Sequence, residues 1–371
     1  MMIETYSSQN YHFSMNKRHS IRTSFILIVI FLAAAGMLLF AARRFPGFAQ
    51  WYSVAIYPAL VGSIGRLCGV ISWSVAELLC FLLPALIIID LVLSGIRKHL
   101  GGALIRFLLL ASILFFLYAA CCGVNYYREP FVSKETIESA EISQVDLVGF
   151  CEYTASELNE CYKKPGPDNE FSVPEYPAGD LLRDEAVTAI LSIGDTRLIG
   201  YYPRPKILRF ISGFFSSMGV SGIYSPFTIE ANINGDMPGM EMPFTACHEL
   251  SHLRGFMNEG EANYIGWLAC INSDNKSFNR SGWLIAWSYA GAALHRTDPD
   301  KFAEIYETLP SEAIRELTEN NEFWRSHKTK ASDVQDKVND AYLKSNGQDH
   351  GIESYGQLTT LMLTWFKTKG L

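Results

Sequence analysis

Acidic side chains are almost absent from the first third of this 371-residue chain. Only three precede residue 129, where ten lysines and arginines give a net charge of +7. The remaining residues carry 35 acidic and 21 basic side chains, a net charge of −14. This acidic part has no basic patch of the kind that binds a phosphate backbone. We therefore expect no nucleic-acid partner.

The chain also lacks a disulfide framework, an internal repeat and a low-complexity segment. Its eight cysteines include no C-x-x-C pair, which gives no support for a cysteine-based metal site. Cys151 and Cys161 lie ten residues apart on one predicted helix, too far to bridge, whereas Cys247 and Cys270 lie on neighbouring predicted helices. Hydrophobic residues make up 49% of the chain, which excludes an intrinsically disordered protein.

Long apolar runs, by contrast, are abundant before residue 129. Residues 23–42 and 107–127 are uncharged, and about 20 apolar residues in a helix cross a bilayer core. Residues 73–95 form a further candidate span. The sequence therefore predicts a multi-pass protein of the cell membrane, with its anchor in residues 1–128 and the lipid bilayer as one partner.

The stretch between the first two candidate spans is less regular. Residues 45–65 are uncharged but contain two prolines, which favours a re-entrant or interfacial segment over a fourth span. Glu77 and Asp90 lie near the ends of the 73–95 span, where we expect their carboxylates to reach the lipid–water interface.

Basic residues predict the orientation of the anchor. With three spans, the positive-inside rule puts two clusters in the cytoplasm and the domain from residue 129 outside it. A fourth span at 45–65 would reverse this. The clusters are Lys17, Arg18 and Arg22, and Arg97, Lys98 and Arg106.

Residues 129–371 show the pattern of a mostly helical domain with a small β element. Residues 224–234 alternate apolar and polar side chains, which predicts a strand. Helical spacing of apolar residues predicts helices near 146–164, 180–193, 206–216, 281–295, 301–326, 332–345 and 354–368, with two adjacent helices in 243–272.

The most informative motif is H-E-x-x-H, at His248, Glu249 and His252. Residues four apart share one face of a helix, so both imidazoles can bind a single Zn²⁺. Glu249 lies beside that face, where its carboxylate can take a proton from a metal-bound water. A catalytic zinc site needs a third protein ligand and one open position.

The third ligand follows from the residues after the motif. A metzincin would continue with a third histidine, and Asn258 stands at that position, so this reading fails. Glu259 and Glu261 remain. Asn258 is a natural N-cap for the second helix, and Glu261 then occupies the reciprocal position of a capping box. We therefore prefer Glu259, with Glu261 as the alternative. Asn263, one turn later, is suited to a hydrogen bond with a liganding histidine.

The combination of H-E-x-x-H with E-G-E-A-N at 259–263 resembles the gluzincins, in which the first Glu of the second motif binds zinc. Over nearly its full length the chain is similar to the bacterial DUF3810 family of predicted membrane-bound zinc metallopeptidases. The matching segments are N-Y-Y-R at 125–128, P-F-T-I-E-A-N-I-N at 226–234, P-F-T-A-C-H-E-L-S-H-L-R-G-F at 243–256 and Y-L-K-S-N-G-Q-D-H-G-I-E-S-Y-G-Q-L at 342–358.

This resemblance implies a zincin-like fold and two further elements. Zincins have a strand near the zinc helix that pairs with an extended peptide, which suggests the segment containing Glu230, Ala231 and Asn232 as the substrate strand. They also need a donor for the oxyanion of the tetrahedral intermediate. Tyr355 and His350, in the C-terminal matching segment, are the candidates.

The sequence thus predicts a mainly α, membrane-anchored zinc metallopeptidase that hydrolyses peptide bonds in a peptide or protein substrate. The alternative is a non-catalytic zinc-binding sensor or scaffold of the cell envelope. Glu249 argues for the enzyme, because a structural zinc site does not need a general base and usually has four protein ligands.

Overall fold

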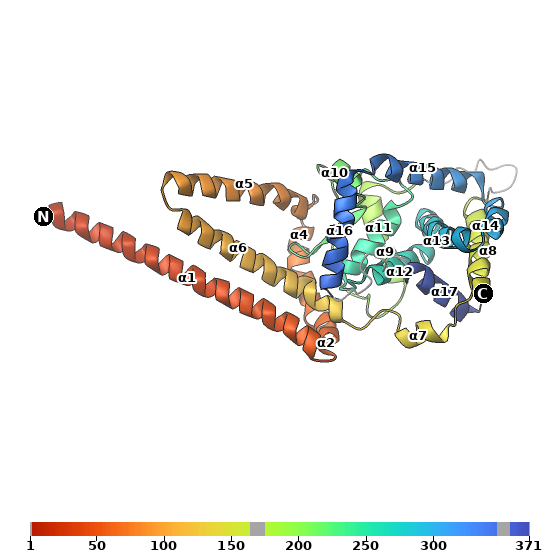
Figure 1. Cartoon of the computed structure of the whole chain (residues 1–371), viewed down its shortest axis with the longest axis horizontal. Coiled ribbons are helices and arrows are strands. Elements are labelled where there is room, and N and C mark those ends of the chain that lie inside the picture. Colours follow the sequence, from red (N-terminus) through yellow and green to blue (C-terminus); the bar gives the residue numbers. More distant parts are fainter. Residues whose placement is uncertain (1, 164–174, 347–356, 371) are drawn as a thin grey trace.

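The computed structural model describes residues 2–163, 175–346 and 357–370. It is mainly helical, and long helices of the N-terminal part project from a rounded C-terminal part (Figure 1). The predicted fold class is therefore correct in its coarse form: apolar helices followed by a mostly helical domain with a small sheet.

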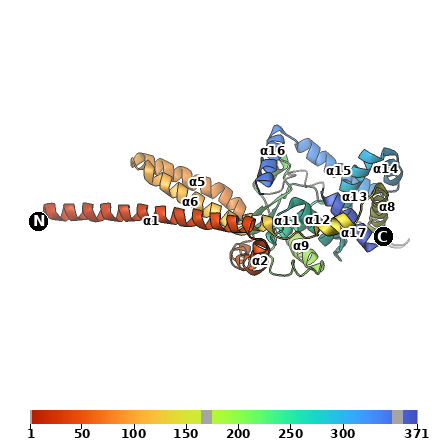
Figure 2. The ribbon, with the colours of Figure 1, turned by 60° about the horizontal axis from the view of Figure 1, so that its bottom comes forward.

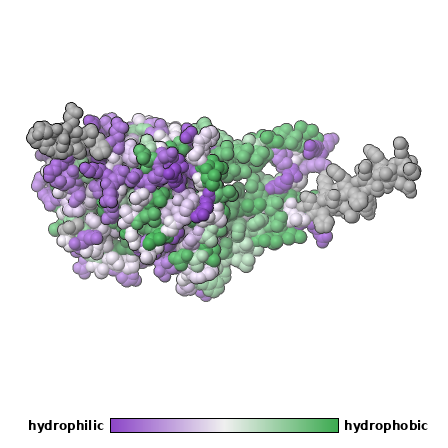
Figure 3. Space-filling view, turned by 180° about the vertical axis from the view of Figure 1, so that it is seen from behind, coloured by the Kyte–Doolittle hydropathy of each residue, from purple (hydrophilic) through white to green (hydrophobic). Residues whose placement is uncertain are grey.

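Three helices are long and apolar enough to cross a membrane, which is consistent with membrane association. They are α1 (Met2–Arg44), α5 (Val75–Ile96) and α6 (Leu100–Cys121), with apolar stretches at Ile21–Arg44, Val75–Ile96 and Leu100–Tyr127. Helices α1 and α6 lie side by side (Figure 2), and the rings of Phe31 and Phe116 are 5.6 Å apart between them. Hydrophobic residues cover this region in a continuous band on the face drawn in Figure 3.

The segment between α1 and α5 forms a series of short helices, none of membrane-spanning length. They are α2 (Phe48–Ala55), α3 (Tyr57–Leu60), a π-helical turn (Val61–Gly65) and α4 (Arg66–Gly69). Their buried side chains contact the C-terminal part. The Tyr57 hydroxyl donates to the carbonyl of Leu253 at 2.9 Å and lies 2.8 Å from the Tyr224 hydroxyl.

A three-stranded sheet lies beside these short helices. It contains β1 (Lys206–Ile207), β2 (Gly222–Ser225) and β3 (Glu230–Ile233) in the order β1-β3-β2. Strand β3 is parallel to β1 and antiparallel to β2. The predicted single strand at 224–234 is therefore wrong, because the chain turns after Ser225. The predicted helix at 206–216 is wrong in its first half, where Lys206–Ile207 forms β1 and the helix begins only at Ser212.

This topology also corrects the predicted substrate strand. Strand β3 has a partner on each side and all four of its residues are buried, so Glu230, Ala231 and Asn232 cannot pair with a peptide. The side chains of Glu230 and Asn232 bind the start of α5 instead. Glu230 accepts from the backbone N–H groups of Val75 and Ala76, and Asn232 accepts from the Ser74 hydroxyl.

Eleven helices of the described ranges make up most of the C-terminal part. The predicted helix at 301–326 is two helices, α14 and α15. The full set is α7 (Lys134–Ser139), α8 (Gln144–Cys161), α9 (Gly179–Ser192), α10 (Ser212–Ser217), α11 (Met242–Leu253), α12 (Glu259–Ile271), α13 (Lys276–Thr297), α14 (Pro299–Tyr306), α15 (Ser311–His327), α16 (Lys330–Ser345) and α17 (Gln357–Lys369).

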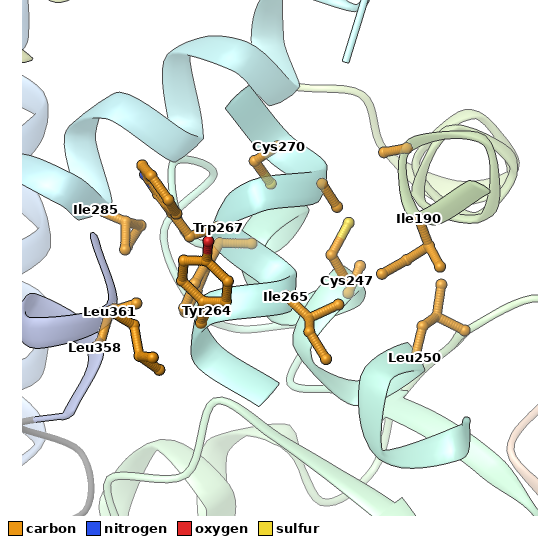
Figure 4. Close-up of a cluster of buried hydrophobic side chains, with 14 of the residues drawn as sticks. Ile190, Cys247, Leu250, Tyr264, Ile265, Trp267, Cys270, Ile285, Leu358 and Leu361 are labelled. Atoms are coloured by element: carbon orange, nitrogen blue, oxygen red, sulfur yellow. The ribbon is translucent and has the colours of Figure 1, made fainter. Parts of the chain in front are cut away.

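The core of this part is built around α11 and α12 (Figure 4). The fully buried Trp267 ring packs edge-on against Trp283 of α13 and Trp365 of α17, with centroids 6.2 and 5.1 Å away. Cys247 and Cys270 are buried on the facing sides of α11 and α12, and both thiols are free. Ten of the twelve residues of α11 are buried, so its position is fixed on most sides by packing.

The Glu77 carboxylate does not lie where the sequence predicts it. Glu77 is buried rather than exposed at the interface, and it accepts hydrogen bonds from three consecutive backbone N–H groups, those of Arg209, Phe210 and Ile211. Asp90, near the other end of α5, forms an ion pair with Arg106 at 2.7 Å.

Candidate metal centre

Helices α11 and α12 bring together a cluster of three side chains that could hold a metal ion. One ligand atom of each residue, His248, His252 and Glu259, lies within 4.8 Å of the others. The Glu259 Oε2 atom is 3.4 Å from His248 Nε2 and 3.6 Å from His252 Nε2. The two imidazoles share a helix face because they are one turn apart, and their ring centroids are 4.6 Å apart.

The turn between the two helices places Glu259. Gly255 ends α11 with a φ of 91°, a left-handed conformation that favours glycine. Asn258 is the N-cap of α12, as predicted, and its side chain accepts from the N–H of Glu261 at 3.1 Å. Glu259 is consequently the first residue of α12, where its carboxylate meets the positive end of the helix dipole and faces both histidines.

A hydrogen bond sets the tautomer of His252. Its Nδ1 atom lies 2.7 Å from the carbonyl oxygen of Phe256, in the same turn. Because a carbonyl can only accept, Nδ1 carries the hydrogen of a neutral His252 ring. The lone pair of the neutral ring is then on Nε2, the nitrogen on the side of Glu259 that would bind a cation.

The side chains of the cluster shift one another's pKa values. Burial alone would raise the pKa of Glu259, but the facing His252 and His248 hold that pKa well below its usual range. Burial alone would lower the pKa of His252, but the Glu259 carboxylate raises it to about 9. The three groups thus place an anionic oxygen against two imidazole nitrogens, which is a suitable environment for a cation.

Glu249 lies beside this cluster and is not one of its members. It is buried, and its Oε2 atom has no hydrogen-bond partner in the described part of the chain. Burial raises the pKa of Glu249 to about 7, although His248 and His252 oppose the shift. A Cβ atom on Gly222 of β2 would lie 2.6 Å from Glu249 Oε1, so the glycine leaves the space that this carboxylate occupies.

Glu261 is in a different place from Glu259. Its carboxylate accepts from the backbone N–H of Phe131 at 2.9 Å and lies near Arg128 and Arg197. The predicted reciprocal capping bond to the backbone of Asn258 is not among the interactions of the described residues. Burial raises the pKa of Glu261 to about 7, against the effect of these neighbours.

The remaining predicted residues contribute no contact to the cluster. Asn263 is buried, but its Nδ2 atom has no partner in the described ranges, and neither has His248 Nδ1. The predicted hydrogen bond from Asn263 to a histidine is therefore not formed. Tyr355 and His350 lie outside the described residues.

The family assignment rests on one comparison. A family model described as "Protein of unknown function (DUF3810)" matches residues 52–363. The chain belongs to the DUF3810 family. No curated protein and no solved structure matches it. The part shared with the DUF3810 family includes α5, α6, the sheet and all three residues of the cluster.

In this DUF3810 protein Tyr289 of α13 lies within electrostatic range of the cluster. Burial and the nearby carboxylates of Glu241 and Glu259 raise the pKa of its phenol to about 12. The sequence does not point to Tyr289, because α13 is the second helix after α11 and no motif surrounds this tyrosine.

Proposed function

We propose that this DUF3810 protein is a membrane-anchored, zinc-dependent peptidase that hydrolyses peptide bonds. The observation that carries the proposal is the placement of the buried Glu249 carboxylate, with one unpartnered oxygen, directly beside the His248–His252–Glu259 cluster. Two imidazole nitrogens and one carboxylate oxygen form a typical zinc ligand set, and three protein ligands leave a position for water.

The three ligands and Glu249 have different tasks in this proposal. A bound Zn²⁺ would act as a Lewis acid and make water a nucleophile near neutral pH. His248, His252 and Glu259 would hold the ion, with His252 oriented by the Phe256 carbonyl. Glu249 would accept the proton of the attacking water and return it to the nitrogen of the leaving amine. Its buried position keeps competing water away from this proton transfer.

The free edge of β2 is the proposed place for the peptide. Strand β2 pairs with β3 on one side, and no described strand pairs with its other side. Gly222, at the start of β2, contacts the Glu249 side chain, so a peptide added along β2 would run past the general base. Pairing through main-chain hydrogen bonds gives affinity with little sequence selectivity.

We further propose an extracytoplasmic position for the C-terminal part. The N-terminus of α1 and the α5–α6 connection lie at the end of the molecule away from the sheet and the cluster (Figure 1). Both carry the basic clusters of the sequence, which the positive-inside rule assigns to the cytoplasm. The three spans then place the cluster on the opposite side of the membrane.

The test uses the full-length protein in lipid nanodiscs, with bound metal measured by mass spectrometry and cleavage measured on a peptide library. Glu249→Gln should keep stoichiometric zinc and lose about 10²–10⁴-fold in cleavage rate, the usual contribution of a general base. Stoichiometric zinc with no cleavage of any peptide by the native chain would favour the non-catalytic sensor or scaffold.

A matched pair of variants tests the ligand set independently of activity. Glu259→Ala should lose zinc, whereas Glu261→Ala, two residues away, should keep it because its carboxylate faces Phe131. The reverse result would show that the third ligand is Glu261. Zinc retained by His252→Ala would refute the site altogether.

A further inference from the structure

The outer face of helix α16 is apolar and exposed. Ala331, Val334, Val338, Ala341 and Tyr342 fall within about 100° of its circumference, since each residue advances about 100° around an α-helix. Val334 and Val338 are 60% and 59% exposed. A helix of a soluble domain normally turns such an apolar arc toward the core.

Helix α16 contacts the protein along a strip beside the arc and, at its C-terminal end, through Tyr342. The buried residues of this strip are Ser332 and Leu343, which lie about 80° and 100° beyond the Tyr342 edge of the arc. The apolar side of α16 therefore faces outward, whereas a helix packed on a protein core turns its apolar side inward. An exposed apolar arc of this kind marks an interaction surface.

Contacts at both ends fix the position of α16. At its C-terminal end, Tyr126 donates to the Tyr342 hydroxyl at 3.2 Å and Tyr118 donates to Asn346 at 2.6 Å. Arg43, at the end of α1, donates to the carbonyl of Ser345 at 3.3 Å. Helix α16 thus begins beside α10 and ends on the membrane-exit ends of α1 and α6, and it runs crosswise to α1 at that level (Figures 1 and 2).

A row of lysines borders the apolar arc on one side. Lys330, Lys337 and Lys344 are seven residues apart, which aligns them along the helix. Lysine side chains in this position extend toward lipid phosphates while their methylene groups cover apolar surface. The aspartates of α16 lie farther from the arc, on the side that would face water. They are Asp333, Asp336 and Asp340.

We propose that α16 is an interfacial helix that lies on the bilayer, with Val334 and Val338 inserted among the lipid headgroups and the lysine row at the phosphates. This inference rests on the proposed membrane insertion of α1, α5 and α6, because the bilayer surface continues outward from the ends of these spans. An apolar arc with a basic border at the level of the headgroups fits an anionic lipid surface.

Photo-crosslinking of the full-length protein in phosphatidylethanolamine–phosphatidylglycerol nanodiscs tests the proposal. The photoreactive amino acid p-benzoylphenylalanine replaces Val334 or Val338 and, as controls on the opposite side of the same helix, Asp333 or Asp336. Leu86, exposed in the middle of α5, reports on the insertion of the spans. We expect a severalfold higher yield of lipid adducts at 334 and 338 than at 333 and 336.

The other outcomes separate the two proposals. Lipid adducts at position 86 but none above the control level at 334 and 338 would overturn the interfacial role and leave the membrane anchor intact. No adduct at any position, 86 included, would contradict insertion itself. Adducts of 334 and 338 with this chain or a second copy would show that protein, not lipid, covers the apolar arc.

A second measurement does not depend on the photoreactive group. In nanodiscs, the double variant Val334→Asp/Val338→Asp should be cut by trypsin after Lys344, whose neighbours are unchanged, severalfold faster than the native protein, because two charges expel the arc from the headgroups. The matched variant Asp333→Asn/Asp336→Asn should be cut at the native rate. Equal rates for all three proteins would contradict the proposal.

Discussion

Replacing Glu77 by alanine should destabilise the connection between the spans and the sheet. Glu77 lies in the first turn of α5, and its Oε1 atom is 2.9, 2.6 and 3.0 Å from the backbone nitrogens of Arg209, Phe210 and Ile211. No other hydrogen-bond partner of these three N–H groups is present in the described ranges. Glu77→Ala therefore removes the acceptor of all three donors at once.

The size of the effect follows from these bonds. A hydrogen bond to a charged group contributes about 1.5–3 kcal/mol, and three of them are not additive because water reaches part of the opened site. Each buried donor left without an acceptor costs about 1–3 kcal/mol, and we take about 3–5 kcal/mol as the combined loss for the three. At about 2–4 °C per kcal/mol, this lowers the apparent unfolding temperature by roughly 6–20 °C. Glu77→Gln should lose less, because its amide oxygen still accepts.

Tryptophan fluorescence of the full-length protein in nanodiscs measures this shift, and trypsin cleavage after Arg209 reports on local opening. Glu160→Ala is the control, because within the described ranges the Glu160 side chain forms an exposed ion pair with Lys163 and no other hydrogen bond or ion pair, and such pairs contribute about 0–1 kcal/mol. An unfolding temperature of Glu77→Ala equal to that of Glu160→Ala, with Arg209 still resistant to trypsin, would refute this account of Glu77.

Two further substitutions probe α11 and its neighbours. Gly222→Ala places a Cβ atom 2.6 Å from Glu249 Oε1, so we expect this variant to retain zinc and to cleave peptides about 10²-fold more slowly. The control is Gly213→Ala, whose Cβ atom meets no atom within 4 Å and which should cleave at the native rate. Burial raises the pKa of Glu241 above 4.5, so the folded state favours its protonated form. The unfolding temperature of the native protein should therefore fall relative to Glu241→Gln as the pH rises above 4.5, and parallel curves would contradict this.

Local patterns in the sequence were sufficient to predict the three long apolar helices and the cluster. Each apolar run of α1, α5 and α6 is long and nearly uncharged, so its identity does not depend on distant residues. The cluster is also local, because His248, His252 and Glu259 lie within twelve consecutive residues. Helix periodicity and the cap at Asn258 were enough to prefer Glu259 over Glu261.

Non-local pairing explains the predictions that failed. The alternation at 224–234 continues through two strands, and only the turn after Ser225 and the pairing of β3 with β1 show that β3 is central. From its place in the sequence, Glu77 is expected to be an interfacial carboxylate. Its three N–H donors come from the loop at 209–211, which is more than 130 residues away along the chain. The exposed side of α16 also depends on tertiary contacts, since periodicity identifies an apolar arc without showing what it faces.

The same long-range contacts imply that residue 129 is not a structural boundary. Buried hydroxyls connect α3, α6 and the domain: Tyr57 donates to the carbonyl of Leu253 at the end of α11, and Tyr224 of β2 donates to the carbonyl of Cys121 at 3.1 Å. Glu230 binds the N-terminus of α5. In residues 129–371 alone, Tyr224 and Glu230 would lose these buried partners, at a cost of about 1–3 kcal/mol for each unsatisfied group. The N-terminal helices therefore complete the framework that holds β2 and α11, and the whole chain is the unit that positions the His248–His252–Glu259 cluster.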